Sequence, residues 1–135
     1  MYKKFYWYRS GVTNTMKIAL KDIFLNIKKM SIMKSGDTIL DIGANDGTLL
    51  KYFKNEGFTT IGCEPAKNLT NELKRNSKFV INNFWNFKYL NNILKKNKLK
   101  KPKVITAIGM FYDLENPSKF ISDAAKPLDD NGVFI

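Results

Sequence analysis

A short stretch of acidic, amide and glycine residues, DIGANDG, has the side chains and backbone freedom needed to hold a small molecule. It covers residues 41–47, between the apolar run TIL and the amphipathic segment TLLKYF. Gly43 and Gly47 allow the backbone to approach a ligand closely, and Asn45 tolerates the left-handed conformation better than most residues. These features predict a ligand-binding loop between a buried strand and a helix.

Two carboxylates, Asp41 and Asp46, distinguish between the cofactors that such a loop can hold. A dinucleotide loop has the spacing G-x-G-x-x-G, which brings bare amides and a helix N-terminus to a pyrophosphate. Here the spacing is G-x-x-x-G, and the two acids would repel a pyrophosphate. S-adenosylmethionine carries an ammonium and a sulfonium but no phosphate, so the acidic loop favours it over NAD on electrostatic grounds.

A third carboxylate, Glu64, ends the next predicted strand, 17 residues after Gly47. A carboxylate there can accept hydrogen bonds from both ribose hydroxyls of a nucleoside, in NAD and S-adenosylmethionine alike. The alternative is an ordinary acid at a helix N-terminus, before Pro65. Combined with the glycine loop at this distance, the position favours the nucleoside role.

Alternating apolar runs and helical segments predict the scaffold that positions these residues. An amphipathic helix is expected over residues 14–30, with Asn14 as its N-cap. Strands are expected at 38–42, 59–63, 78–82, 104–110 and 132–135, and helices at 47–57, 65–76, 85–99 and 117–126. Five strands separated by helices predict an α/β fold, a Rossmann-like doubly wound parallel sheet. In such a sheet the loop at 41–47 lies at the ligand-binding end.

Composition and charge limit the class of protein. The chain has 135 residues, of which 44% are hydrophobic, as expected for one globular domain. Its net charge of +11 is typical of proteins with anionic partners, but the excess is mostly lysine, and we do not expect a nucleic-acid partner. Residues 95–103 contain six lysines and are interpreted as a solvated helix end and loop rather than a phosphate-binding patch.

A single cysteine, Cys63, and the absence of histidine limit the chemistry further. They exclude an internal disulfide, a cysteine zinc cluster and a histidine base, so no metal site is expected. The sequence also has no apolar run of the ~20 residues that a membrane span needs, and no signal-peptide core. We therefore expect a cytoplasmic protein.

The segment DIGANDGTLLKYFKNEGFTTIGCEPAKN resembles the cofactor half of class I S-adenosylmethionine-dependent methyltransferases. Its N-D-G loop followed by G-x-E-P-A resembles the sugar C-methyltransferase group, as do YWYRSGVTNTM and ITAIGMFYDLENPSKFISDAAKPLDDNGVFI. The resemblance implies methyl transfer from S-adenosylmethionine to a small-molecule acceptor such as a nucleotide-linked sugar. The alternatives are a non-catalytic remnant that binds the cofactor or a partner, and an NAD-dependent oxidoreductase.

The same resemblance implies roles for individual residues. Asp41, Gly43 and Gly47 would surround the methionine part of the cofactor, and Glu64 would hold the ribose. Phe84 or Trp85 would stack on the adenine or, alternatively, pack in the core. The predicted cofactor-binding residues are Asp41, Gly43, Asn45, Asp46, Gly47, Glu64, Phe84 and Trp85.

Two further segments are predicted to serve the acceptor. Tyr8, Arg9 and Ser10 would cover the cofactor as a lid or substrate contact, unless they form only a mobile terminus. Sugar C-methyltransferases often have a histidine base after the fourth strand, where this sequence reads MFYDLENP. Asp113 or Tyr112 could remove the acceptor's proton there, although a cap and turn is the equal alternative.

The resemblance also leads to an expectation about domain organisation. Full-length members of the group begin with a cysteine-rich zinc segment and continue past the fifth strand. We expect residues 1–135 to be a single S-adenosylmethionine-binding domain truncated after the fifth strand, with 1–36 as lid segment and helix. An uncovered fifth strand at 132–135, with Val133, Phe134 and Ile135, would favour self-association.

Overall fold

The computed structural model describes residues 13–108 and 116–135. In chain order the elements are α1 (Asn14–Lys29), β1 (Thr38–Ile42), α2 (Thr48–Asn55), β2 (Thr59–Cys63), the 3₁₀ turn η1 (Lys67–Leu69), α3 (Thr70–Asn76), β3 (Phe79–Ile81), α4 (Phe87–Lys96), β4 (Val104–Thr106), α5 (Pro117–Ala125) and β5 (Val133–Phe134).

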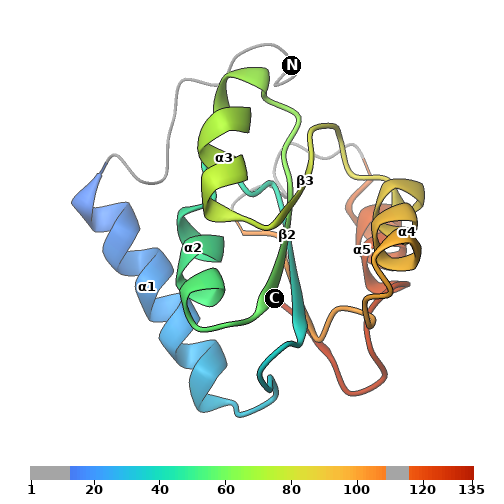
Figure 1. The fold of residues 1–135 in the computed structure, drawn as a ribbon, viewed down its shortest axis with the longest axis horizontal. Coiled ribbons are helices and arrows are strands. Elements are labelled where there is room, and N and C mark those ends of the chain that lie inside the picture. Colours follow the sequence, from blue (N-terminus) through green and yellow to red (C-terminus); the bar gives the residue numbers. More distant parts are fainter. Residues whose placement is uncertain (1–12, 109–115) are drawn as a thin grey trace.

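The described strands form one parallel sheet in the order β3-β2-β1-β4-β5. The helices α1, α2 and α3 lie on one side of this sheet, and α4 and α5 lie on the other (Figure 1). The predicted doubly wound α/β fold is therefore confirmed. Because the strand order changes direction at β1, the loop that follows β1 lies where such sheets bind ligands.

The core is divided between the two faces of the sheet. Ile39 of β1 and Val104 of β4 belong to the cluster that includes Phe53 of α2. Their neighbours Leu40 and Ile105 belong to the opposite cluster, since successive side chains of a strand point to opposite faces. The central strands are buried on both faces and give the loops at their ends a rigid support.

Two helix starts differ from the predicted ones because polar side chains cap them. Thr13, not Asn14, is the N-cap of α1: its Oγ1 accepts a hydrogen bond from a helix N–H at 3.3 Å. Asn86 caps α4 in the same way at 2.9 Å, so this helix begins at Phe87 instead of Trp85.

The remaining differences concern segments at the ends of strands. The helix predicted over 65–76 begins later, as the turn η1 at Lys67, because Ala66 is extended, and it continues as α3 from Thr70. The strand predicted over 104–110 ends at Thr106, and residues 109–110 lie outside the described part. In the described sheet β5 is an edge strand, and self-association through it stays a prediction. No helix among the described residues has both the length and the apolar character needed to cross a bilayer.

Candidate functional site

The loop between β1 and α2 owes its shape to three left-handed residues. Gly43 has φ 76°, Asn45 has φ 56° and Gly47 has φ 83°. Two are glycines and the third is an asparagine, the residue types that adopt this region at least cost. The alternation turns the chain sharply at the carboxyl end of β1, where α2 begins.

Backbone hydrogen bonds hold this loop against the neighbouring strand. The N–H groups of Gly43 and Ala44 both donate to the carbonyl oxygen of Cys63, at 2.8 and 3.0 Å. Cys63 is the last residue of β2, so the loop is fixed to the strand that carries Glu64. These bonds therefore fix the glycine loop after β1 relative to the end of β2.

Asp46 precedes Gly47, the N-cap of α2, and contacts the first residue of the helix. Its Oδ1 accepts hydrogen bonds from the backbone N–H and the hydroxyl of Thr48, at 3.1 and 2.7 Å. Its carbonyl oxygen accepts a hydrogen bond from Asn76 Nδ2 at 2.8 Å, which ties the loop to the end of α3. The carboxylate of Asp46 therefore shapes the loop and adds negative charge to it.

Glu64 joins the ends of three strands through its side chain and backbone. The residue is 5% exposed; its Oε1 accepts a hydrogen bond from Asn45 N–H at 2.9 Å, and its Oε2 accepts one from Ala66 N–H at 3.0 Å. Its carbonyl oxygen accepts a hydrogen bond from Asn82 Nδ2 at 2.9 Å, beyond β3. The bond from Ala66 is the local contact expected of an acid before a turn, and the bond from Asn45 is a contact with the glycine loop.

Asp41 is a second buried carboxylate, on the adjacent strand. Its Oδ1 accepts a hydrogen bond from Thr106 Oγ1 of β4 at 2.7 Å. Burial raises the pKa of Asp41 to about 7, against the lowering effect of the Thr106 bond and with a further rise from the charge of Glu64. Burial also raises the pKa of Glu64, although its two backbone hydrogen bonds oppose the rise. The carboxyl end of the sheet thus holds two desolvated acids whose ionised forms a cation would stabilise.

The two aromatic candidates after β3 differ in their surroundings. Phe84 is 46% exposed, whereas Trp85 packs against the core cluster around Leu90. The indole N–H of Trp85 is buried and has no hydrogen-bond partner among the described residues. Phe84 is thus the more exposed of the two, and Trp85 is partly buried against the core, while stacking of either ring on an adenine stays a prediction.

The five predicted lid and proton-transfer residues lie outside the described part of the chain. These residues are Tyr8, Arg9, Ser10, Tyr112 and Asp113.

Sequence reasoning did not identify the polar partners of the acids, Thr106 and Asn82. Thr106 lies directly beside Asp41 in the paired strands, a relation that requires knowing that β1 and β4 are neighbours. A threonine at the end of an otherwise apolar strand was the available signal.

One family model matches most of the chain. It is described as "Methyltransferase domain" and matches residues 16–135. A search of curated proteins found no match.

Several solved structures have a similar fold. A SAM-dependent methyltransferase from Thiobacillus denitrificans, in complex with S-adenosyl-L-homocysteine, is 18% identical with a TM-score of 0.60, covering 85% of this chain and 45% of that one. One from Geobacter sulfurreducens, with the same ligand, is 14% identical with a TM-score of 0.59, covering 96% and 49%. The plantazolicin methyltransferase BamL, in complex with a triazolic desmethylPZN analog and SAH, is 19% identical with a TM-score of 0.67, covering 90% and 46%. This chain spans about half the length of each.

Proposed function

The chain belongs to the methyltransferase domain family, and we propose that it binds S-adenosylmethionine at the carboxyl ends of β1 and β2 for methyl transfer to a small-molecule acceptor. The family match and the ligands of the similar solved proteins support the proposal. The site itself supplies a further, independent argument.

The observation that carries the proposal is the pair of buried carboxylates, Asp41 and Glu64, on adjacent strands beside the left-handed loop. Both lose solvation in the fold, and the pKa of each is raised mainly for that reason. A ligand with a positive charge would offset this cost, whereas a pyrophosphate would add to it. S-adenosylmethionine has two cationic groups and no phosphate, so it suits this end of the sheet better than NAD does.

Different residues of the site would contact different parts of the ligand. The backbone at Gly43 and Gly47 would lie along the methionine part, with Asp41 supplying negative charge for its cationic groups. Glu64 is already oriented by the N–H groups of Asn45 and Ala66. Each of its oxygens keeps a further lone pair, which could accept a hydrogen bond from a ribose hydroxyl. The exposed ring of Phe84 could stack on the adenine.

Little else is needed from the protein for the reaction. The cofactor, when bound, supplies an activated methyl group, and the protein has to place the acceptor in line with it. A carbon or hydroxyl acceptor must also lose a proton, and Asp113 and Tyr112 are our proposed bases. Tyr8, Arg9 and Ser10 are proposed to close over the bound cofactor as a lid.

We propose a nucleotide-linked sugar as the acceptor on the sequence resemblance alone. The N-D-G loop and the G-x-E-P-A segment resemble the sugar C-methyltransferase group. The similar solved protein BamL is named for plantazolicin, so the fold by itself does not select a sugar.

Calorimetric titration with S-adenosylhomocysteine and with NAD tests the proposal. We expect S-adenosylhomocysteine to bind at the glycine loop and NAD not to compete with it, because the two buried acids disfavour a pyrophosphate there. Displacement of S-adenosylhomocysteine by NAD would contradict the proposal. A methyl-transfer assay with a panel of nucleotide sugars then tests the acceptor separately.

A further inference from the structure

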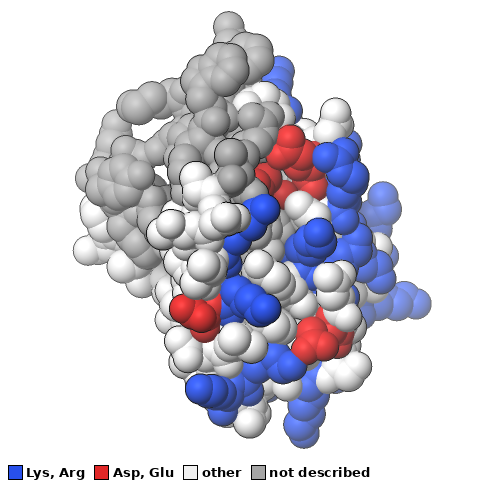
Figure 2. Space-filling view, turned by 90° about the vertical axis from the view of Figure 1, so that its left-hand side faces the viewer, with Lys and Arg blue, Asp and Glu red and all other residues white. Residues whose placement is uncertain are grey.

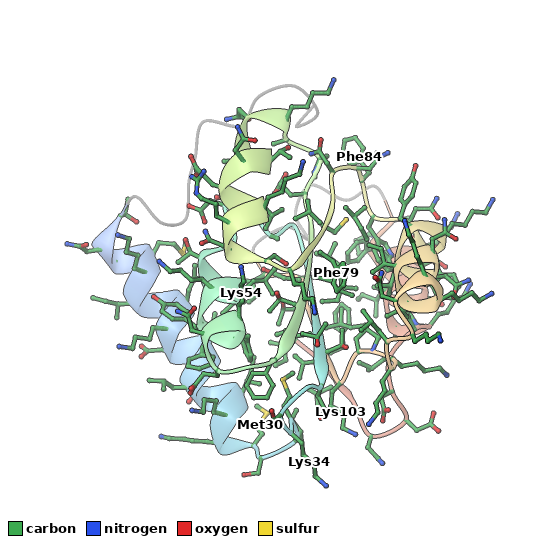
Figure 3. The ribbon with its side chains drawn as sticks, in the orientation of Figure 1. Met30, Lys34, Lys54, Phe79, Phe84 and Lys103 are labelled. Carbon is green, nitrogen blue, oxygen red and sulfur yellow. The ribbon has the colours of Figure 1, made fainter. Side chains whose placement is uncertain are left out.

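A second set of charged residues surrounds a hollow at the opposite end of the sheet, where the strands begin. The hollow has a volume of about 260 Å³ and is lined by residues from three separate segments of the chain. Figure 3 shows Lys34 and Lys103 together at this end of the molecule, although they are far apart in sequence. The lining residues are Ile32, Lys34, Asp37, Lys100, Lys101, Lys103 and Asp129.

The acids of the hollow are already engaged, and most of its lysines are not. Asp37 Oδ2 accepts a hydrogen bond from Lys34 N–H at 2.8 Å. Asp129 Oδ1 lies 3.3 Å from Lys103 Nζ and also accepts a hydrogen bond from a backbone N–H at 2.9 Å. The ammonium groups of Lys34, Lys100 and Lys101 have no hydrogen bond or ion pair within the described residues.

The backbone around the hollow is fixed by hydrogen bonds between its three segments. Lys103 N–H donates to Thr38 O at 2.8 Å, and Asp129 N–H donates to Pro102 O at 2.9 Å. Val133 N–H donates to Lys103 O at 2.9 Å. The lysine stems therefore project from a frame that needs little ordering when a ligand binds.

We propose that this hollow is a binding site for a condensed phosphate, free or as the phosphate tail of a nucleotide. Four lysines against two aspartates leave an excess of positive charge that attracts an anion. A condensed phosphate is compact and multivalent, so it can contact the lysines before β1 and those before β4 at once. Lysine ammoniums act as point charges and bind phosphate without a fixed planar geometry.

The shape of the hollow favours a compact anion over an extended nucleic-acid strand. The four lysines line a single hollow of about 260 Å³, a size that suits a compact anion. The site lies at the end of the sheet opposite the glycine loop, so it is separate from the proposed methyltransferase site.

The test is calorimetry of the full chain with inorganic pyrophosphate and with uridine diphosphate, at low ionic strength. The variant is K100Q/K101Q, which removes two unpaired lysines from the hollow. Lys and Arg also occupy much of the side of the molecule seen in Figure 2, so a control of equal charge is needed. K17Q/K21Q removes two exposed lysines of α1, away from the hollow.

We expect pyrophosphate to bind, the hollow variant to weaken binding roughly tenfold or more, and the α1 variant to change it less than about threefold. If uridine diphosphate follows the same pattern, the ligand is a nucleotide tail; if only pyrophosphate binds, it is a free condensed phosphate. Absence of binding by both ligands would overturn the proposal. Equal weakening in both variants, or tighter binding of a single-stranded oligonucleotide than of pyrophosphate, would overturn it too.

Discussion

The two ends of the same parallel sheet differ in the sign and the burial of their charged side chains. At the carboxyl ends, the carboxylates of Asp41 and Glu64 are buried and accept hydrogen bonds from strands and loops. At the amino ends, Lys34, Lys100 and Lys101 are exposed around a hollow. In a parallel sheet, the loops that follow the strands all lie at one end and the loops that precede them all lie at the other. Each end can therefore carry its own set of charged residues on one shared core.

The difference shows which charged groups lower the stability of the unliganded fold and which do not. Water solvates the lysines of the amino end, so their charges cost little in the absence of a ligand. The acids of the carboxyl end are desolvated, and their ionised forms destabilise the unliganded fold. An arrangement that lowers stability in this way is typical of a functional site.

The largest expected effect is on the pH dependence of stability. The pKa of Asp41 rises from 3.8 to about 7 on folding, which corresponds to at most ~4 kcal/mol. Its protonated form stabilises the fold fully below about pH 4, and this contribution is lost as the pH rises through about 7. The rise in the pKa of Glu64 has the same sign. Urea unfolding should therefore show lower stability at pH 8 than at pH 5 for the unliganded protein.

D41N should flatten this profile and be more stable than the wild type at pH 8. Asp129 at the amino end is the matched control, because a backbone hydrogen bond from Asn131 and the Lys103 ammonium lower its pKa. Its contribution is present above the unfolded pKa and is lost on acidification, so D129N should leave the loss between pH 5 and 8 intact. A D41N profile as steep as that of the wild type would contradict the buried-acid account.

The second effect compares two left-handed glycines, one at each end. A Cβ at Gly47 would lie 2.8 Å from Asn76 Cβ and 2.9 Å from Leu73 Cδ1, whereas a Cβ at Gly36 meets nothing within 4 Å. Gly36 has φ 86° and Gly47 φ 83°, so the backbone strain is equal. G47A should cost about 2–4 kcal/mol and G36A about 1–2 kcal/mol of unfolding free energy. Equal costs in urea unfolding would show that α3 does not pack tightly behind the loop.

The third effect concerns cofactor affinity. E64Q keeps the size of the side chain but removes the charge that would hold the ribose hydroxyls. Hydrogen bonds to a charged group are worth ~1.5–3 kcal/mol, so S-adenosylhomocysteine should bind about 10- to 150-fold more weakly. E56Q, at an exposed acid that pairs with Lys28, is the control and should leave the affinity unchanged. An unaltered affinity in folded E64Q would refute the ribose role.

The smallest effect is on the pKa of Asp41 itself. The hydrogen bond from Thr106 lowers this pKa, so T106V should raise it further. T38V is the control, since Thr38 is equally buried but begins β1 at the other end. An NMR titration of the Asp41 carboxyl carbon measures both variants. No upward shift in T106V would show that the bond across β1 and β4 does not affect ionisation.

Much of the carboxyl end could be predicted because its features are local in sequence. The strand before Gly43, the left-handed residues and the distance to Glu64 all lie within a single strand–helix–strand unit. The contact between Asn45 N–H and Glu64 follows from the pairing of two consecutive strands. Boundaries were less accurate where a neighbouring side chain decided the cap, as Thr13 does for α1.

The amino end could not be predicted in the same way. The lysine run at 95–103 was interpreted as solvated, and no local pattern connects it with Lys34. The two meet only because β4 pairs with β1, which is far away in the sequence, as the register of Ile39 with Val104 shows. The partnership of Asp41 with Thr106 depends on the same pairing. Strand order is a property of the whole fold. Contacts between residues on strands that are distant in sequence therefore cannot be predicted from local sequence patterns.

The most direct test of the central claim, that the carboxyl ends of β1 and β2 bind the cofactor, is an amide NMR titration with S-adenosylhomocysteine. We predict shifts for residues 43–47, Glu64 and Ala66, and none for residues 34–37, Lys100, Lys101 and Lys103. Shifts confined to the amino end, or no shifts at any amide, would contradict the claim.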